Sequence, residues 1–139
     1  MNNSCNTVTA HNTVRSATRM MDKVIDSCTQ LIGALEATKE EVTSFGTKLT
    51  DNVMKNEYVD RVLGYLEMLQ KFTMDLKKHA HTHFTDGKSV KELLDQLHTY
   101  SDKLHAKMLE NSFFFNHFSL RVLEITQTIK KIKDNLSVN

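Results

Sequence analysis

Hydrophobic residues recur at alternating spacings of three and four from residue 14 to residue 49, the heptad pattern of helices that pack along a seam. One set of positions holds Val14, Met21, Cys28, Leu35, Val42 and Leu49, and the interleaved set holds Ala17, Val24, Leu31, Thr38 and Phe45. Ile25 and Ile32 widen the stripe, so we expect this helix to contact two neighbours. The pattern predicts a first long helix over residues 14–50.

A second hydrophobic repeat follows, out of phase with the first. Its positions are Tyr58, Val62, Tyr65, Leu69, Phe72 and Leu76. Asn52 and Asn56 take positions that the first repeat would keep apolar, and Asn and Asp side chains compete with helix by bonding the local backbone. The sequence favours a turn or sharp break at 50–57 over a continuous helix with locally altered coiling. It predicts a second helix over 57–83.

A helix start follows the second repeat. Asp86 and Gly87 are a turn pair, and Ser89 with Glu92 three residues later is a capping box, in which the two side chains bond free amides of the first turn. We therefore expect a third helix to begin at Val90.

The third heptad repeat keeps one phase from residue 90 to residue 136. One set holds Leu94, Ser101, Met108, Phe115, Val122, Ile129 and Leu136, and the other holds Val90, Leu97, Leu104, Asn111, Phe118, Ile125 and Ile132. The Glu-Asn-Ser segment at 110–112 could interrupt the helix, but the unchanged phase favours one uninterrupted helix over 90–136. Such a helix would be about 70 Å long at about 1.5 Å per residue.

The scarcity of turn-forming residues supports an all-α fold. The chain of 139 residues has no proline and four glycines, whereas sheets and loop-rich folds use both residues in turns. The three repeats predict an elongated antiparallel helical hairpin or a three-helix coiled-coil bundle. We expect the polar, aperiodic residues 1–12 to be a flexible N-terminal segment and residues 13–139 to form a single helical coiled-coil domain.

Charge and cysteine content exclude several classes of protein. Eighteen Lys and Arg residues against seventeen Asp and Glu residues give no global field that would attract nucleic acid. The sequence has no apolar run of transmembrane length, and its N-terminus lacks the basic start of a secretory signal. Cys5 and Cys28 are too few for a disulfide framework. We therefore expect a reduced, cytoplasmic chain with no transmembrane segment and no nucleic-acid partner.

Four phenylalanines within six residues could belong to a ligand pocket, a membrane wedge or a helix-packing site. Phe115 and Phe118 lie on the seam and are core positions by spacing. Phe113 and Phe114 lie off the seam, beside Asn111, its single amide. An aromatic layer beside a buried Asn resembles a layer that sets helix register, with a third helix or another chain covering the extra rings.

We expect this layer and its neighbours along the seam to bind helical protein partners, either further copies of the chain or other subunits. The predicted partner-binding residues are Leu97, Leu104, Met108, Asn111, Phe113, Phe114, Phe115, Phe118, Val122 and Ile125. One end of the long third helix should need cover outside its own bundle, because an exposed seam of several turns is unusual on a soluble monomer.

His79, His81 and His83 raise the hypothesis of a metal site. His79 and His83 have a helical spacing that chelates zinc, and Glu92 is a candidate third ligand across the turn. The glutamate of an HExxH motif is missing, however, and histidines near a helix end also complement the helix dipole. We therefore expect no metal site and no cofactor.

His98 and His105 flank the seam beside Asp95 and Asp102, and a His–carboxylate pair can orient a general base. No nucleophile or oxyanion donor is identifiable beside them, so we expect these charges to influence partner choice, as coiled-coil flanks do. Residues 86–89 match the end of a phosphate loop but lack its first glycine and preceding strand. We predict no catalytic residue.

Three short strings resemble fragments of small helical subunits of the complex that builds lysosome-related organelles. They are LIGALEATKEEV at 31–42, YLEML at 65–69 and YSDKLHAK at 100–107. Coiled coils share such strings by composition, so the resemblance implies a class, helical subunits of assemblies, and assigns no family.

The sequence predicts a non-catalytic coiled-coil interaction or scaffold subunit that assembles into a homo-oligomer or a multi-subunit helical complex through its heptad seams. The alternative is a membrane-surface or secreted helical effector that inserts the Phe-rich segment 113–118. The lysines of 130–135 complement the dipole at a helix end. They could also contact an anionic membrane surface, so peripheral membrane contact is a second alternative. An enzyme is the least favoured class because the seams are almost wholly apolar.

Overall fold

The computed structural model describes residues 3–48, 52–82 and 87–137, with the side chains of 19–48, 57–82 and 89–136. These parts of the chain form four helices and no strand: α1 (Asn3–Gly46), α2 (Asn52–His81), α3 (Gly87–Leu109) and α4 (Ser112–Ser137). The prediction of an all-α fold is confirmed.

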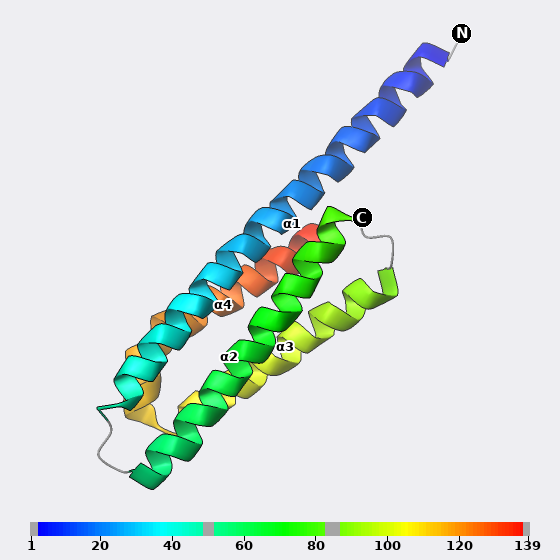
Figure 1. Cartoon of the computed structure of the whole chain (residues 1–139). Coiled ribbons are helices and arrows are strands. Elements are labelled where there is room, and N and C mark those ends of the chain that lie inside the picture. Colours follow the sequence, from blue (N-terminus) through cyan, green and yellow to red (C-terminus); the bar gives the residue numbers. More distant parts are fainter. Residues whose placement is uncertain (1–2, 49–51, 83–86, 138–139) are drawn as a thin grey trace.

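The four helices form an antiparallel bundle (Figure 1). Each helix packs against the next one in the chain, and α4 packs back against α1, so that α1 and α3 lie on one diagonal and α2 and α4 on the other. Short connections between successive helices favour this arrangement. The N-terminal part of α1 extends past the ends of the other three helices (Figure 1).

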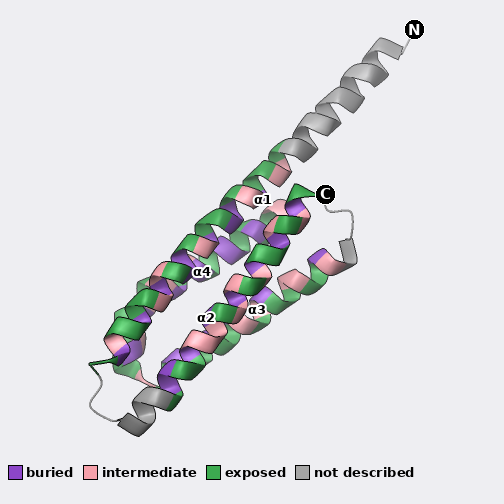
Figure 2. Ribbon diagram, viewed as in Figure 1, coloured by how far each residue is buried: buried purple, intermediate pink, exposed green. Residues whose placement is uncertain are grey.

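The core lies between the inward faces of the four helices (Figure 2). Its buried residues on the predicted seams are Val24, Cys28, Leu31, Leu35, Thr38 and Val42 on α1, Val90, Leu97, Ser101, Leu104 and Met108 on α3, and Phe118, Val122, Ile125, Ile129 and Ile132 on α4. The heptad spacing therefore identified the core faces of α1, α3 and most of α4, because alternating spacings of three and four keep side chains on one face of a helix.

The seam of α2 differs in part from the predicted one. Its buried positions are Tyr58, Val59, Val62, Leu66, Leu69, Thr73, Leu76 and Ala80. Tyr65 and Phe72, which the sequence placed in the seam, are half-buried at its edge, where their ring centroids lie 6.1 and 5.6 Å from that of Tyr100 on α3. Large rings such as these can pack at the edge of a helix interface, and Leu66, Leu69 and Thr73 fill the centre of the seam beside them.

The structure corrects the predicted number of helices from three to four over the described chain. The third repeat predicts a single helix over 90–136, but α3 ends at Leu109 and α4 begins at Ser112. The hairpin and three-helix predictions are wrong because this break turns the C-terminal segment back to pack on α1. The predicted break between the first two helices is present but lies earlier than 50–57, since α1 ends at Gly46 and α2 already begins at Asn52.

Helix boundaries differ from the predicted ones at three starts, and α2 begins at Asn52 where the sequence predicts residue 57. The structure has helix from Asn3 onward, where the sequence predicts a flexible segment over 1–12, and no proline or glycine precedes Gly33 to interrupt it. α3 begins at Gly87 and not at Val90, so Ser89 lies within its first turn. Residues 49–50 and 83, the ends of the first two predicted helices, lie outside the described residues.

Gly46 marks a close approach between α1 and α2. The residue is buried, and a Cβ atom at this position would lie 3.0 Å from Cγ2 of Val59. Glycine therefore lets the end of α1 lie against α2 immediately before the chain turns.

Candidate functional site

Aromatic side chains gather at the end of the bundle where α1 leads into α2 and α3 leads into α4. This aromatic end comprises Phe45, Tyr58, Phe113, Phe114, His117 and Phe118. The ring of Phe45 lies edge-on to those of Phe114 and Phe118, at 5.4 Å each, and stacks on His117 at 4.3 Å. Edge-to-face and offset stacked rings are the preferred aromatic geometries. Most of the Phe-rich segment thus packs within its own chain.

Tyr58 joins the aromatic end to the C-terminus of α3. Its hydroxyl donates a hydrogen bond of 3.0 Å to the backbone carbonyl of Met108, while its ring lies 5.0 Å from that of Phe114. Burial raises the pKa of Tyr58, and the charge of Glu110 raises it further. The phenol therefore stays protonated and donates to the carbonyl of Met108, which has no amide partner within α3 because it lies in the last turn of the helix.

Asn111 is the N-cap of α4. Its side-chain Oδ1 accepts a hydrogen bond of 3.1 Å from the amide of Phe114, and its carbonyl accepts one of 2.9 Å from the amide of Phe115. Asn is among the best residues at this position because its oxygen satisfies an amide that the first helical turn leaves unpaired. Asn111 thus starts a helix and does not lie on an unbroken seam.

Most of the predicted partner-binding residues belong to the chain's own core. Those that are buried are Leu97, Leu104, Met108, Phe114, Phe118, Val122 and Ile125. Asn111 and Phe115 are half-buried, whereas Phe113 is 69% exposed. Their role in binding a partner stays a prediction, and Phe113 is the member of the set whose side chain is mainly accessible.

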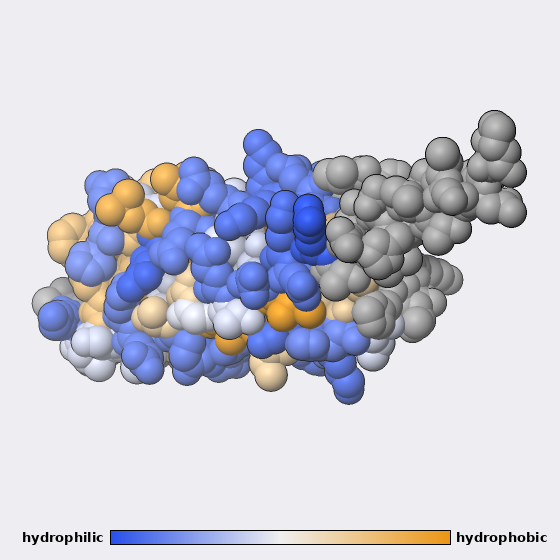
Figure 3. All heavy atoms as spheres, turned by 90° about the horizontal axis from the view of Figure 1, so that it is seen from above, coloured by the Kyte–Doolittle hydropathy of each residue, from blue (hydrophilic) through white to orange (hydrophobic). Residues whose placement is uncertain are grey.

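The outer face of α4 carries an exposed hydrophobic row. Phe113, Leu120 and Leu123, which we call the outer row, are 69%, 78% and 50% exposed. Figure 3 shows hydrophobic side chains gathered toward one end of the molecule. Leu120 and Leu123 were not predicted, because a single seam was assigned to this segment. Leu120 follows Phe113 by seven residues and Leu123 follows Leu120 by three, a heptad spacing that could have identified them.

An ion pair borders the outer row on its α1 side. The Nε and Nη2 atoms of Arg121 donate to the two carboxylate oxygens of Glu41, at 3.1 and 2.5 Å, and its Nη1 donates to Glu124 at 3.2 Å. Hydrogen bonds from Arg121 lower the pKa of Glu41, and those to Glu41 raise the pKa of Arg121. This bidentate geometry fixes α4 against α1.

A shallow depression of about 380 Å³ lies between α1 and α4 at the aromatic end. Its lining consists of Glu40, Glu41, Ser44, Phe45, Lys48 and His117. The carboxylates and the lysine place both signs of charge around an aromatic floor. The depression adjoins the outer row, because His117 lies between Phe113 and Leu120 along α4.

A second open cleft, of about 530 Å³, lies between the last turns of α2 and the first turns of α3. It brings together His79 and Glu92, two of the residues considered as metal ligands, over an apolar floor of Phe72 and Leu93. Among the side chains that the structure describes, those of residues 19–48, 57–82 and 89–136, no group of three His, Cys, Asp or Glu is placed to hold a metal ion. His83 lies outside the described residues.

Three further side chains of chemical interest are His105, His98 and Cys28. His105 stacks on Phe115 with ring centroids 5.3 Å apart, and the Nε2 atom of His98 is buried without a hydrogen-bond partner among the described atoms. Cys28 is a free, buried thiol, and burial raises its pKa to about 12 while the charge of Lys77 opposes the shift. Such a thiol is a poor nucleophile at neutral pH because it is almost entirely protonated.

No helix over the described residues has an apolar stretch sufficient to cross a bilayer. No protein-family model, no curated protein and no solved structure matches this chain significantly. Function is therefore inferred from the chain's own surfaces.

Proposed function

We propose that this chain is a non-catalytic helical interaction protein that assembles with other helical chains, either copies of itself or other subunits. The observation that carries the proposal is the outer row of Phe113, Leu120 and Leu123. Single exposed apolar residues are ordinary on protein surfaces, but a row of large ones on one helix face is typical of an interaction site.

The packing of the four helices moves the expected assembly surface from the heptad seams to the outer face of α4. The sequence predicts association through the heptad seams, but most of the described seam residues are buried by the other helices of the same chain. We therefore propose assembly through the surface that the bundle leaves uncovered. In this proposal the outer face of α4 forms the coiled-coil contact with the partner, and the core seam of α4 stays packed within its own bundle.

The interior supports a non-catalytic role. The buried polar residues of the described core are Ser27, Thr38, Thr73, Ser101 and Thr128. The hydroxyls of Thr38, Thr73 and Thr128 bond carbonyls of their own helices, at 2.6, 2.7 and 2.7 Å. Catalytic and metal sites inside bundles are built from several inward-pointing Glu and His residues, whereas the buried residues of the described core include neither and His98 is a single half-buried histidine. The free thiol of Cys28 supports a reducing, cytoplasmic location as part of the proposal.

The test compares association in the native chain and in an outer-row variant. We expect the native chain either to exceed its monomer mass in light scattering or to capture a specific helical protein from its own lysate. Replacing Phe113 and Leu120 by Glu should abolish that association without loss of helicity by circular dichroism, because both side chains are exposed. Met74→Glu, at an exposed position on α2, is the control and should associate normally. A monomer that captures nothing would contradict the proposal.

A membrane-surface effector is the second candidate, and the exposure of Phe113 and Leu120 favours it to a limited extent. Insertion of the whole Phe-rich segment would require the bundle to open, because Phe114 and Phe118 are fully buried. Flotation with anionic and neutral vesicles separates the two functions. Stable flotation that Phe113→Glu abolishes would favour the membrane function over the interaction protein.

A further inference from the structure

We propose that the outer face of α4 pairs with the same face of a second copy of this chain, in antiparallel orientation, about a two-fold axis between Leu120 and Leu123. This inference rests on the proposed function and names the partner for it. A two-fold interface uses the same surface on both copies, so the surface must be complementary to itself.

The outer face of α4 has the spacing of a second heptad seam. Its positions are Phe113, Asn116, Leu120, Leu123, Gln127 and Lys130, which follow one another at intervals of three, four, three, four and three. The structure exposes all of these residues, while the core seam of α4 faces the other helices of the bundle. α4 therefore presents two seams on different sides, one occupied within the chain and one open.

Antiparallel pairing places complementary side chains in every layer of this open seam. With Leu120 opposite Leu123 of the second copy, the two central layers are Leu against Leu. Asn116 then lies opposite Gln127 of the second copy, where the two amides can bond each other. The outermost layers pair Phe113 with Lys130 of the second copy, and an ammonium group over an exposed ring is a favourable cation–π contact. The axis likewise makes the Asn–Gln layer and the Phe–Lys layer occur twice, once on each side of the centre.

The flanks of the open seam are also compatible with this register. His117 and Glu124 lie on the α1 side of α4 and come near each other across the axis, so no like charges meet there. On the α3 side, Ser119 and Thr126 come near each other. Glu124 already bonds Arg121 within its own chain, which holds the carboxylate at the edge of the seam.

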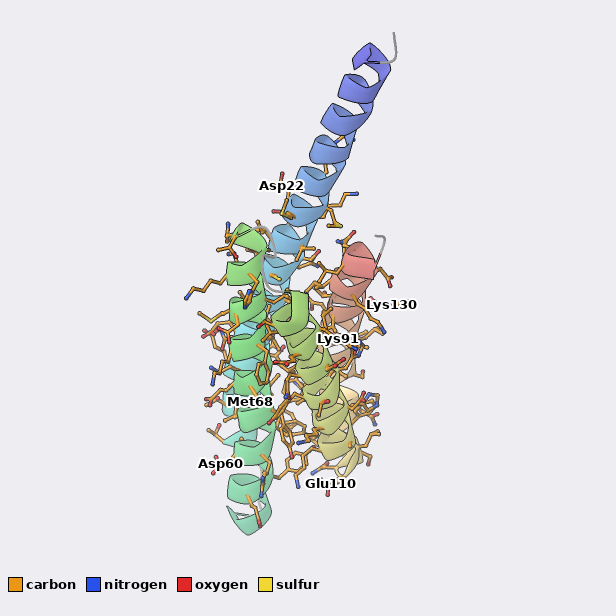
Figure 4. All side chains as sticks on the ribbon, turned by 90° about the vertical axis from the view of Figure 1, so that its right-hand side faces the viewer. Asp22, Asp60, Met68, Lys91, Glu110 and Lys130 are labelled. Atoms are coloured by element: carbon orange, nitrogen blue, oxygen red, sulfur yellow. The ribbon has the colours of Figure 1, made fainter. Side chains whose placement is uncertain are left out.

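The parallel alternative is poorer because it pairs each residue with itself. Lys130 would then face Lys130 of the second copy, and like charges in direct opposition are destabilising. Antiparallel pairing removes this repulsion by moving Lys130 to the other end of the interface. Figure 4 shows the two ends of α4, with Glu110 immediately before the helix and Lys130 toward its C-terminus.

The extent of the contact predicts a dissociable dimer. The seam from residue 113 to residue 130 is about 26 Å long at about 1.5 Å per residue. A single helix pair with two central leucine layers is small beside the interfaces of obligate dimers. We therefore expect a monomer–dimer equilibrium whose dimer is visible in light scattering at about 100 μM chain and is lost on dilution.

Leu120→Glu combined with Leu123→Glu tests the surface. These side chains are 78% and 50% exposed, so the variant should keep the helicity of the native chain while remaining a monomer at the highest concentration. Met74→Glu, at a position that is 55% exposed on α2, should dimerise like the native chain. A native dimer that the double substitution leaves intact would overturn the inference while leaving the proposed function standing. If the native chain is a monomer but still captures another helical protein, the pairing of two copies is likewise overturned and the proposed function is kept.

Thiol cross-linking tests the orientation in a Cys5→Ser background, where Cys28 is buried and protonated. A mixture of Asn116→Cys and Gln127→Cys chains treated with a short bismaleimide should give a mixed dimer on gels. Each variant alone should give markedly less product, because its thiols lie far from each other across the axis. Efficient cross-linking of Asn116→Cys alone would show parallel pairing and overturn the proposed register.

Discussion

The hydroxyl of Tyr58 on α2 donates a hydrogen bond of 3.0 Å to the backbone carbonyl of Met108, one residue before the end of α3. The same carbonyl accepts the amide of Asn111 at 3.1 Å. One carbonyl thus receives a side chain from a neighbouring helix and the backbone of the turn into α4. The contact ties the aromatic end of the bundle to the chain reversal that creates the fourth helix.

Tyr58→Phe should remove this bond while keeping the ring against Phe114. We expect a loss of about 0.5–1.5 kcal/mol in the free energy of unfolding, measured by urea denaturation at neutral pH, because the carbonyl keeps its second donor. Tyr65→Phe, at a half-buried position outside the aromatic end, is the control and should lose less. Equal losses in the two variants would contradict a specific role for the Tyr58 hydroxyl.

The stability of the native chain and that of Tyr58→Phe should respond differently to alkaline pH. Burial raises the pKa of Tyr58 above its usual 10.0, so the folded chain keeps the proton that the unfolded chain releases. The stability contributed by the protonated phenol is complete below pH 10.0 and declines as the pH rises past it. The advantage of the native chain over Tyr58→Phe should therefore shrink above that pH, and an advantage that grew would contradict the assignment.

The adjacent residues Phe113 and Phe114 should differ widely in their importance for stability. Phe114 is fully buried between Phe45, Tyr58 and Phe118, so Phe114→Ala should cost about 3–5 kcal/mol. Phe113 is 69% exposed, and Phe113→Ala should change the free energy of unfolding by about 0.5 kcal/mol or less. Urea denaturation of both variants checks the contrast, and comparable losses would contradict the burial pattern.

The sequence predicted the core of α1 and α3 well because residues such as Leu31 and Leu97 recur on one helical face. It missed the chain reversal at Asn111 for a physical reason. Leu104 and Phe118 occupy the same heptad position whether the chain continues or folds back, and both are buried. Spacing fixes which side of a helix is apolar, but it does not fix where the next helix goes.

The candidate surface was less predictable than the core. The segment from 90 to 136 was given one apolar seam, so the exposed Leu120 and Leu123 were overlooked, and Phe114 was expected to be covered by a third helix or by another chain. Its cover comes from Phe45 on α1 and Tyr58 on α2, residues distant in the sequence. Long-range contacts of this kind depend on the order of helices in the bundle, which a heptad pattern leaves open.

Asn111→Ala separates the observed break from a continuous helix. If α3 and α4 were one helix, Ala would stabilise it, because Ala is the best helix former. With Asn111 as the N-cap of α4, we expect Ala to cost about 1 kcal/mol through loss of the bond to the Phe114 amide. Asn111→Asp keeps the accepting oxygen and should remain close to the native stability. Thermal or urea denaturation checks both, and stabilisation by Ala would contradict the capping role.

The ion pair between Glu41 and Arg121 should contribute to stability in a pH-dependent way. Hydrogen bonds from Arg121 lower the pKa of Glu41 below its usual 4.5, so the folded chain favours the charged carboxylate. The contribution is therefore present above pH 4.5 and is lost as the pH falls through the folded-state value. Both side chains are partly exposed, which limits Glu41→Gln to a cost of about 0.2–1 kcal/mol at neutral pH and low salt.

Glu40→Gln is the matched control, because it removes a carboxylate from the neighbouring residue and leaves the bidentate pair intact. Urea denaturation at neutral pH should separate the two variants, and the difference should narrow as the pH falls through the lowered pKa of Glu41 and its carboxylate becomes protonated. In an Arg121→Gln background, Glu41→Gln should have little further effect, because its partner is already gone. A difference that persisted unchanged at low pH, or that survived the loss of Arg121, would mean that Glu41 acts through something other than this contact between α1 and α4.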